Sequence, residues 1–409
     1  MSSEMFDIEK IREQFPILER EVYGRRLIYL DSAATAQKPR CVVEKMEELL
    51  LHDNANIHRG VHLLSEEMTA KYEEAREVVR EFVGAECREE TVFTSGATMS
   101  LNLVASSYCE KFLHEGDNVV VSHIEHHSNI VPWQLATESK GAELRVIPVD
   151  DNGALGLDAL DTLVDERTKV VAVTQASNTL GTRPDLVKII TKAHSVGAVV
   201  VVDGCQGVVH GGVDVKALDC DFYAFSGHKL YAPTGIGVLY GKRELLEKMP
   251  PYMGGGDMVD KVTFAKTTYA PLPLKFEAGT SNFIGAVGLA EAIKFLQQFS
   301  AQEVEQHEKE LLDYATAELQ KVEGVRIYGT TSDKSPIISF NVEGCDHYDI
   351  GMILDKQGVA VRTGHHCAEP VMARYGTNGV VRASIALYTN KEDIEMLIKA
   401  VKRAVLMLK

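Results

Sequence analysis

The apolar residues of this chain follow two patterns that alternate from residue 91 onward. Short runs of consecutive apolar residues are typical of buried strands, and segments with an apolar residue every three or four positions are typical of amphipathic helices. Helical segments such as 186–195 lie between the runs. This alternation predicts an α/β fold with a mostly parallel sheet that helices cover on both faces. The predicted strands are 91–94, 118–121, 144–149, 170–174, 199–202 and 222–225.

The pattern differs on both sides of this central region. The N-terminal part predicts an arm with a short helix at 6–18, a strand at 27–30 and helices at 42–51 and 66–83. Later, helices at 283–298 and 302–320 precede strands at 325–328, 336–342, 359–362 and 380–387 and an amphipathic helix at 391–408. We therefore expect an N-terminal arm of residues 1–25 that packs with the small domain, a large domain of residues 26–290 and a small α+β domain of residues 291–409.

Composition narrows the class of protein. The 409 residues are 25% charged and 45% apolar, which is ordinary for a globular chain, and the net charge of -16 argues against a general nucleic-acid binder. The apolar runs are too short to span a bilayer, and residues 1–7 lack the features of a signal peptide. Seven scattered cysteines do not resemble a disulfide framework. These features predict a cytoplasmic protein with reduced thiols and no nucleic-acid or membrane partner.

One predicted strand ends in Ser226-Gly227-His228-Lys229. A lone lysine in a loop is most often a solvated cation. At the carboxyl end of a buried strand, however, a lysine amine can be tuned to form a Schiff base with an aldehyde. Ligands of parallel α/β sheets bind beyond the carboxyl ends of the strands. The interpretation therefore depends on which other residues stand at that edge.

Two further strand ends fit one ligand. The valine run 199–202 ends in Asp203, and a buried carboxylate needs a cationic or donor partner. Asp203 could instead cap a turn, but a carboxylate for a pyridine nitrogen and a lysine for an aldehyde together hold pyridoxal phosphate. Ser95-Gly96-Ala97-Thr98 opens a predicted helix, where free N–H groups favour phosphate, although serine and threonine often cap helices that bind nothing.

Histidines and a cysteine form two more groups. His126 follows the strand 118–121, with His123 and His127 beside it, and could stack on a cofactor ring, shuttle protons or bind a metal. His365, His366 and Cys367 are consecutive, and such neighbours lack the spaced pairs of structural zinc sites, so we predict no metal. Cys367 could be a reactive thiol or a structural residue.

These motifs occur in an order that matches one family. They are residues 56–62 (Asn-Ile-His-Arg-Gly-Val-His), 125–133, 177–178, 203–206, 226–229, 276–280, 362–368 and 382–384. With them, the sequence resembles the group II cysteine desulfurases, the SufS type, within the class V aminotransferase-like pyridoxal-phosphate enzymes. The resemblance runs from about residue 27 to the C-terminus. It implies the type I fold of such transferases, with a seven-stranded, mostly parallel sheet in the large, cofactor-binding domain and the catalytic cysteine loop in the small domain.

The resemblance also implies a role for each matching residue. On the cofactor side, Lys229 would form the Schiff base and carry protons, and His126 would stack on the ring and assist proton transfer. Asp203 would pair with the pyridine nitrogen, and Gln206 would bind the ring hydroxyl. The phosphate would be held by Thr98, Ser226 and His228. Thr280 would reach the phosphate of a second subunit, which implies a homodimer. On the substrate side, the matching residues are His58, Asn178, Arg362 and Arg382, with Arg382 binding the carboxylate. Cys367 matches the nucleophile that becomes a persulfide.

The implied reaction converts L-cysteine to L-alanine and leaves a persulfide on Cys367. A sulfur-acceptor protein of the SufE or SufU kind would then take the sulfur toward iron–sulfur cluster assembly. A selenocysteine lyase or a cysteine sulfinate desulfinase on the same fold is the alternative, and a metal-binding protein would leave Asp203 and Lys229 unexplained. The chain departs from the usual family pattern at Ala97, at Cys205 and at residues 281–283.

Overall fold

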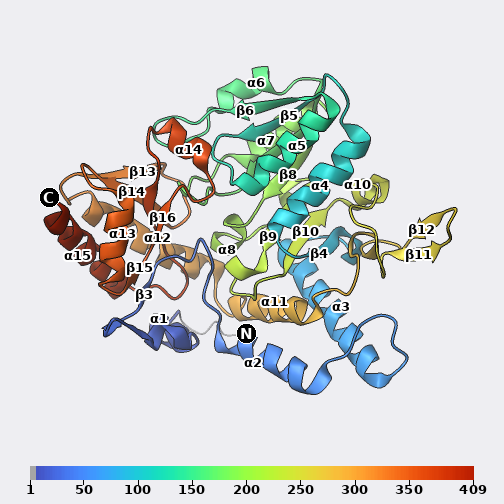
Figure 1. The fold of residues 1–409 in the computed structure, drawn as a ribbon, viewed down its shortest axis with the longest axis horizontal. Helices are drawn as coiled ribbons and strands as arrows, with labels where there is room; N and C mark the ends of the chain where they lie inside the picture. Colours follow the sequence, from blue (N-terminus) through green and yellow to red (C-terminus); the bar gives the residue numbers. More distant parts are fainter. Residues whose placement is uncertain (1–5) are drawn as a thin grey trace.

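A computed structural model describes residues 6–409, so residues 1–5 of the predicted arm lie outside the described part of the chain. Its largest element is a seven-stranded sheet in the order β4-β10-β9-β8-β7-β5-β6 (Figure 1). The strands are β4 (Thr91–Thr94), β5 (Asn118–Ser122), β6 (Glu143–Ile147), β7 (Thr168–Thr174), β8 (Val199–Asp203), β9 (Phe222–Ser226) and β10 (Gly237–Gly241). Strands β6, β5, β7, β8 and β9 are parallel, which confirms the predicted α/β fold with a mostly parallel sheet.

The sequence did not predict β10, which runs antiparallel to both β9 and β4. The sequence pattern did not indicate β10 because the strand begins and ends with glycine, which has a low strand propensity. Gly237 is required by packing rather than by propensity, since a Cβ there would lie 2.4 Å from the Cα of Gly96. Gly96 immediately precedes the helix that begins at Ala97, so this close approach brings the start of that helix against β10.

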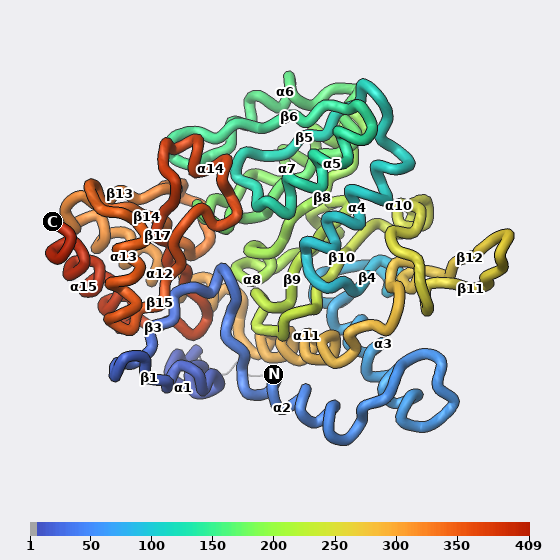
Figure 2. Tube along the Cα trace, viewed as in Figure 1, coloured from blue at the N-terminus to red at the C-terminus, as the bar shows by residue number. Residues whose placement is uncertain are grey.

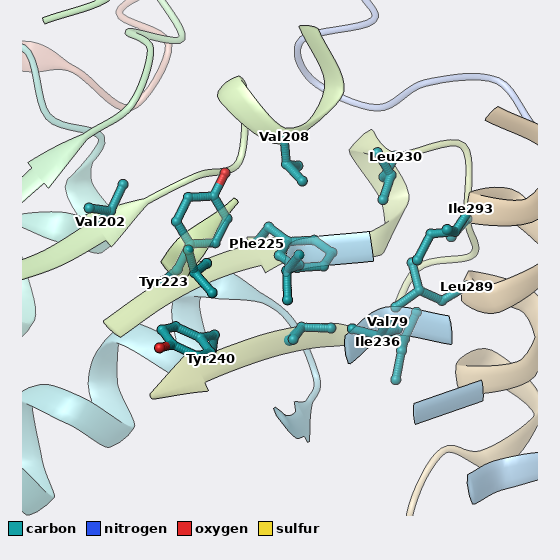
Figure 3. Packing of buried hydrophobic residues seen from close by; sticks show 14 of the residues in the cluster. Val79, Val202, Val208, Tyr223, Phe225, Leu230, Ile236, Tyr240, Leu289 and Ile293 are labelled. Atoms are coloured by element: carbon teal, nitrogen blue, oxygen red, sulfur yellow. The ribbon is translucent and has the colours of Figure 1, made fainter. Parts of the chain in front are cut away.

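Side chains alternate across the sheet, and each face has its own core. Val199 and Val201 pack on the face covered by α4 (Ala97–Phe112) and α5 (Val131–Lys140), together with Trp133. Val200 and Val202 pack on the other face, with α3 (Leu63–Val83), α7 (Leu186–Ser195) and α11 (Phe283–Leu296). Figure 3 shows Val202 in this core together with Val79 of α3 and Ile293 of α11. A strand buried on both faces reads as a continuous apolar run, which explains why the valine run predicted β8.

The small domain has a separate core and a four-stranded antiparallel sheet in the order β13-β14-β17-β16. Its strands are β13 (Val325–Tyr328), β14 (Ile337–Val342), β16 (Arg362–Gly364) and β17 (Val380–Ser384), packed against α12 (Ala301–Leu319), α13 (His347–Asp355) and α15 (Lys391–Leu408). The predicted strand 359–362 is wrong as one element. It forms two, because β15 (Val359–Ala360) pairs with β3 (Ile28–Tyr29) and β16 pairs with β17.

The N-terminal segment lies along the small domain before the chain enters α2 (Arg40–Glu48) (Figure 2). Arg12 of α1 (Ile8–Glu13) and Arg26 of β2 (Arg25–Arg26) both bind Asp393 at the start of α15, at 2.7 and 2.8 Å. Ile28 and Leu30 belong to the small-domain core. The domain limits given above stay a prediction.

The remaining elements are short. They are β1 (Glu21–Val22), β11 (Val259–Val262), β12 (Thr267–Tyr269), α6 (Leu160–Leu163), α8 (Gly207–His210), α9 (Val215–Leu218), α10 (Arg243–Lys248) and α14 (Glu369–Arg374). Within residues 6–409, none of the helices combines the length and the apolar character that crossing a membrane requires.

Candidate active site

A cavity of about 200 Å³ lies at the carboxyl ends of β7, β8 and β9, and small-domain residues form part of its wall. Most of the predicted site residues line it: Thr98, His126, Asn178, Asp203, Ser226, His228, Lys229, Arg362, Cys367 and Arg382. Gln206, His58 and Thr280 do not. Gln206 is buried and donates from Nε2 to the carbonyl of Ala33 (2.9 Å), His58 contacts Glu73 (3.2 Å), and Thr280 is exposed. Sequence reasoning missed Ala33, Ala34, Ser128 and His366 as lining residues.

Lys229 is placed by a short 3-10 turn, Gly227–Lys229, that follows β9 directly. A second segment of the chain fixes this turn. The carbonyl of His228 accepts hydrogen bonds from the backbone N–H of Ala36 (3.1 Å), the hydroxyl of Thr35 (3.2 Å) and Nζ of Lys38 (3.0 Å). The strand end and these three donors together hold Lys229 in the cavity wall.

Another part of the cavity wall suits an anion. Helix α4 begins at Ala97 after its N-cap Gly96, which has a φ of 150°, a glycine conformation, and no side chain of its own to cap the helix. The N–H of Ala97 donates to Oγ of Ser226 (2.8 Å), and the hydroxyls of Thr98 and Ser128 are 2.8 Å apart. Hydroxyl groups and the N-terminus of a sixteen-residue helix form a site of the kind that binds phosphate.

The surroundings of the Asp203 carboxylate show whether these residues fit pyridoxal phosphate. It is 5% exposed and accepts a hydrogen bond from the N–H of Cys205 (3.0 Å), and within residues 6–409 no lysine, arginine or histidine forms an ion pair with it. A buried carboxylate without a cation is costly. A protonated pyridine nitrogen would supply that cation, so the residues present fit the group.

His126 is neutral. Burial and the charge of Lys229 lower the pKa of His126 to about 4. Its Nδ1 accepts a hydrogen bond from the N–H of Ser128 (3.1 Å), so the ring proton is on Nε2. The preceding residue, Glu125, is buried and accepts from the N–H of Thr174 (2.9 Å) and Nδ2 of Asn129 (2.7 Å), which fixes the loop that carries the imidazole.

Cys367 enters the cavity from the small domain on a strained loop. His366 and Cys367 have φ angles of 53° and 56°, a region that residues other than glycine seldom adopt. The carbonyl of His366 accepts from Nδ2 of Asn178 (2.8 Å), and the carbonyl of Cys367 accepts from the N–H of His127 (2.8 Å). The large domain therefore holds this conformation, and Cys367 remains exposed.

Two arginines form the remaining wall. Arg362 and Arg382 are direct partners in the antiparallel pair of β16 and β17. Between them stands Asp31, which sequence reasoning did not select. It follows the predicted strand 27–30 directly, the same strand-end signal that singled out Asp203.

The histidine groups could in principle have bound a metal ion. Among residues 6–409, no group of three or more histidine, cysteine, aspartate or glutamate side chains is arranged to hold a metal ion. His127 Nε2 instead accepts from the N–H of Glu369 (3.2 Å), and His123 Nε2 lies 3.1 Å from the carbonyl of Pro370.

Acidification is expected to destabilise the fold through its buried histidines. Burial lowers the pKa of His366 to about 2, against 6.5 for a free imidazole. At His366 the unfolded chain therefore binds a proton between pH 6.5 and 4.5 that the folded chain does not bind, so the contribution of this histidine to stability falls as the pH falls. Burial also raises the pKa of Glu125 from 4.5 to about 8, which acts in the opposite direction over this range.

A difference measurement separates these effects. His366→Gln should reduce the proton uptake on unfolding between pH 6.5 and 4.5 by up to one proton, measured by denaturation at several pH values. The exposed His114→Gln is the matched control. Unchanged proton uptake in His366→Gln would show that His366 is not held neutral by the fold.

The comparisons with known proteins agree over nearly the whole chain. The aminotransferase class-V family matches residues 28–397. A cysteine desulfurase of Dickeya dadantii is 48% identical over 98% of this chain and 97% of its own length. A cysteine desulfurase of Synechococcus elongatus is 48% identical over 97% of this chain, which spans 64% of that longer relative. The crystal structure of the cysteine desulfurase CsdA from Escherichia coli superposes with a TM-score of 0.93, at 42% identity, over 99% of this chain and all of the other.

Proposed function

Because this chain belongs to the aminotransferase class-V family, we propose that its cavity binds pyridoxal 5′-phosphate and L-cysteine with Cys367 as the sulfur-accepting nucleophile. The chain is a cysteine desulfurase, and pyridoxal 5′-phosphate is its cofactor. One observation carries the proposed assignment of residues. An exposed cysteine of the small domain stands in the wall of the same cavity as Lys229 and Asp203.

The cofactor would be held along the floor of the cavity. Lys229 would attach it covalently, Asp203 would pair with its ring nitrogen, and Thr98, Ser226 and His228 would hold its phosphate. When bound, pyridoxal phosphate supplies an electron sink that stabilises the negative charge left when an amino acid loses its α-proton. Burial and the charge of Lys229 lower the pKa of His228 to about 4, so His228 would act as a neutral donor.

The substrate-side residues would bind and orient L-cysteine. Arg382 would hold the α-carboxylate, since its planar guanidinium can donate two parallel hydrogen bonds. Nδ2 of Asn178 already donates to the cysteine loop, so Asn178 would keep that loop in register with the substrate. The Lys229 amine would move the α-proton, and the neutral imidazole of His126, with its proton on Nε2, would donate to the substrate.

The sulfur step balances without an added oxidant or reductant. The thiolate of Cys367 attacks the substrate sulfur, a sulfur–sulfur bond forms, and the carbon–sulfur bond of the substrate breaks. The electron pair of that bond stays with the substrate carbon, which is then protonated. The net change is L-cysteine plus the Cys367 thiol giving L-alanine plus the Cys367 persulfide.

Two partners belong to the same proposal. A homodimer would bring Thr280 of each subunit to the cofactor phosphate of the other, and the exposure of Thr280 outside its own cavity is compatible with this. A SufE- or SufU-like acceptor protein would take the persulfide sulfur for iron–sulfur cluster assembly. The exposed loop position of Cys367 supports this transfer, because the thiol must meet the substrate and then a protein.

Mass spectrometry after incubation with L-cysteine tests the proposal. The peptide that contains Cys367 is expected to gain one sulfur atom while L-alanine appears in solution, and a thiol reductant should remove that sulfur. Peptides that contain the buried cysteines Cys109 and Cys220 serve as internal controls. Alanine release without added sulfur on the Cys367 peptide would contradict the proposed nucleophile.

A further inference from the structure

Asp31 lies between the two arginines of the cavity wall and contacts both. Its Oδ1 accepts from Nη2 of Arg382 (3.1 Å), and its two oxygens lie 3.2 and 3.1 Å from Nε of Arg362. We propose that Asp31 is the resident counterion of the substrate-carboxylate site and that the carboxylate of the amino acid takes its place on Arg382. This positioning role rests on the proposed function of Arg382.

The two arginines need an anion whether or not substrate is bound. They are directly opposite each other in an antiparallel pair, where like charges repel. Arg382 is 2% exposed, and burial lowers its pKa despite the nearby carboxylate. Within residues 6–409, Asp31 is the one carboxylate that forms an ion pair with either arginine. Without it, two cations would face the cavity uncompensated.

Asp31 satisfies Arg382 only in part. Nη1 of Arg382 donates to the carbonyl of Asn178 (2.9 Å) and Nη2 to Asp31, but Nε has no partner. Nε and Nη2 form one edge of the guanidinium, the edge that a carboxylate binds with two parallel hydrogen bonds. Asp31 contacts one nitrogen of this edge, and the other nitrogen is buried without a hydrogen-bond partner.

A second polar atom of the cavity residues also lacks a hydrogen-bond partner. Oδ1 of Asn178 is buried and has no hydrogen-bond partner. A donor at Arg382 and an acceptor at Asn178, both in the cavity wall, match the carboxylate and the amino group of an α-amino acid. An incoming carboxylate that binds both Nε and Nη2 would compete with Asp31 for Nη2.

The backbone around Asp31 is fixed, so only its side chain can give way. Asp31 forms a parallel bridge with Ser384, whose N–H donates to the carbonyl of Leu30 (2.8 Å). Arg362 can retain the displaced carboxylate, because its Nε contacts both oxygens of Asp31. Asp31 therefore competes with the substrate for Arg382, while Arg362 holds its carboxylate in place.

The test is the affinity of the cofactor-loaded enzyme for propionate, a carboxylate without an amino group. In Asp31→Asn, the competing charge is gone and the amide can still accept from Arg382. We expect the propionate dissociation constant, from thermal-shift titration and from inhibition of cysteine turnover, to fall about tenfold. The KM for L-cysteine should fall with it, and kcat should change less. Asp31→Glu restores the charge and should bind propionate like the unmodified enzyme.

Asp393→Asn is the matched control. Asp393 also bridges two arginines, Arg12 and Arg26, but does not line the cavity. This variant should lose stability without any change in propionate affinity. If Asp31→Asn fails to fold alone, propionate during purification should restore the folded enzyme.

Two results would overturn the proposal. They are unchanged or weaker propionate binding in folded Asp31→Asn, and no rescue of an unfolded variant by propionate. The thermal-shift titration does not depend on turnover. A failure of this inference therefore differs from a failure of the proposed function, in which the unmodified enzyme would release no alanine from cysteine.

Discussion

Cys367→Ala is expected to lower alanine release from L-cysteine by at least about a thousandfold, because the variant lacks the proposed sulfur acceptor. Cys205 is the other thiol in the cavity wall. Burial raises the pKa of Cys205 to about 12, so it holds its proton at neutral pH and is a poor nucleophile. The steady-state rate of alanine formation measures the effect.

The same variant separates the possible substrates. A selenocysteine lyase needs less help from a thiol to release the selenium atom of its substrate. If this enzyme were such a lyase, Cys367→Ala would retain turnover of selenocysteine. Cys345→Ala, a small-domain cysteine outside the cavity, is the matched control and should retain activity with L-cysteine. Turnover of L-cysteine by Cys367→Ala within tenfold of the unmodified enzyme would refute the persulfide mechanism.

The strand ends of the large domain were predictable from the sequence. The apolar run of β8 must be buried on both faces, and its parallel neighbours end at the same edge, so Asp203 and Lys229 had to lie close to one another. His126 lies at the same edge, because it follows the end of β5, another parallel strand of the sheet. Local pattern and sheet geometry were sufficient for this part of the site.

Other features depend on contacts between distant segments. The position of Cys367 depends on hydrogen bonds from Asn178 and His127, which no local pattern encodes. The position of Asp31 depends on the pairing of β3 with β15 and of β16 with β17. The sequence pattern predicted β15 and β16 as one strand, so it did not predict these two pairings. Motif resemblance supplied Cys367, Arg362 and Arg382, but it gave no signal for the carboxylate between the arginines.

Lys229→Ala is expected to lower desulfurase turnover by at least about a thousandfold, because the variant lacks the amine proposed to attach the cofactor and to transfer the α-proton. Proton transfer by a positioned group alone contributes about 10²- to 10⁴-fold. Asp203, Thr98 and Ser226 remain in the cavity, so the variant should still bind pyridoxal phosphate non-covalently.

Borohydride reduction followed by peptide mapping distinguishes attachment from mere binding. In the unmodified enzyme the reduced cofactor should be found on the Lys229 peptide, and in Lys229→Ala it should be released on denaturation. Lys242→Ala is the matched control, since Lys242 follows the adjacent strand β10 but pairs with Asp219 and Asp221 outside the cavity. Reduced cofactor on any other peptide of the unmodified enzyme would contradict the assignment of Lys229. The strand-end position of Lys229 would then be explained by the hydrogen bonds that residues 35–38 donate to the neighbouring carbonyl of His228 rather than by its chemistry.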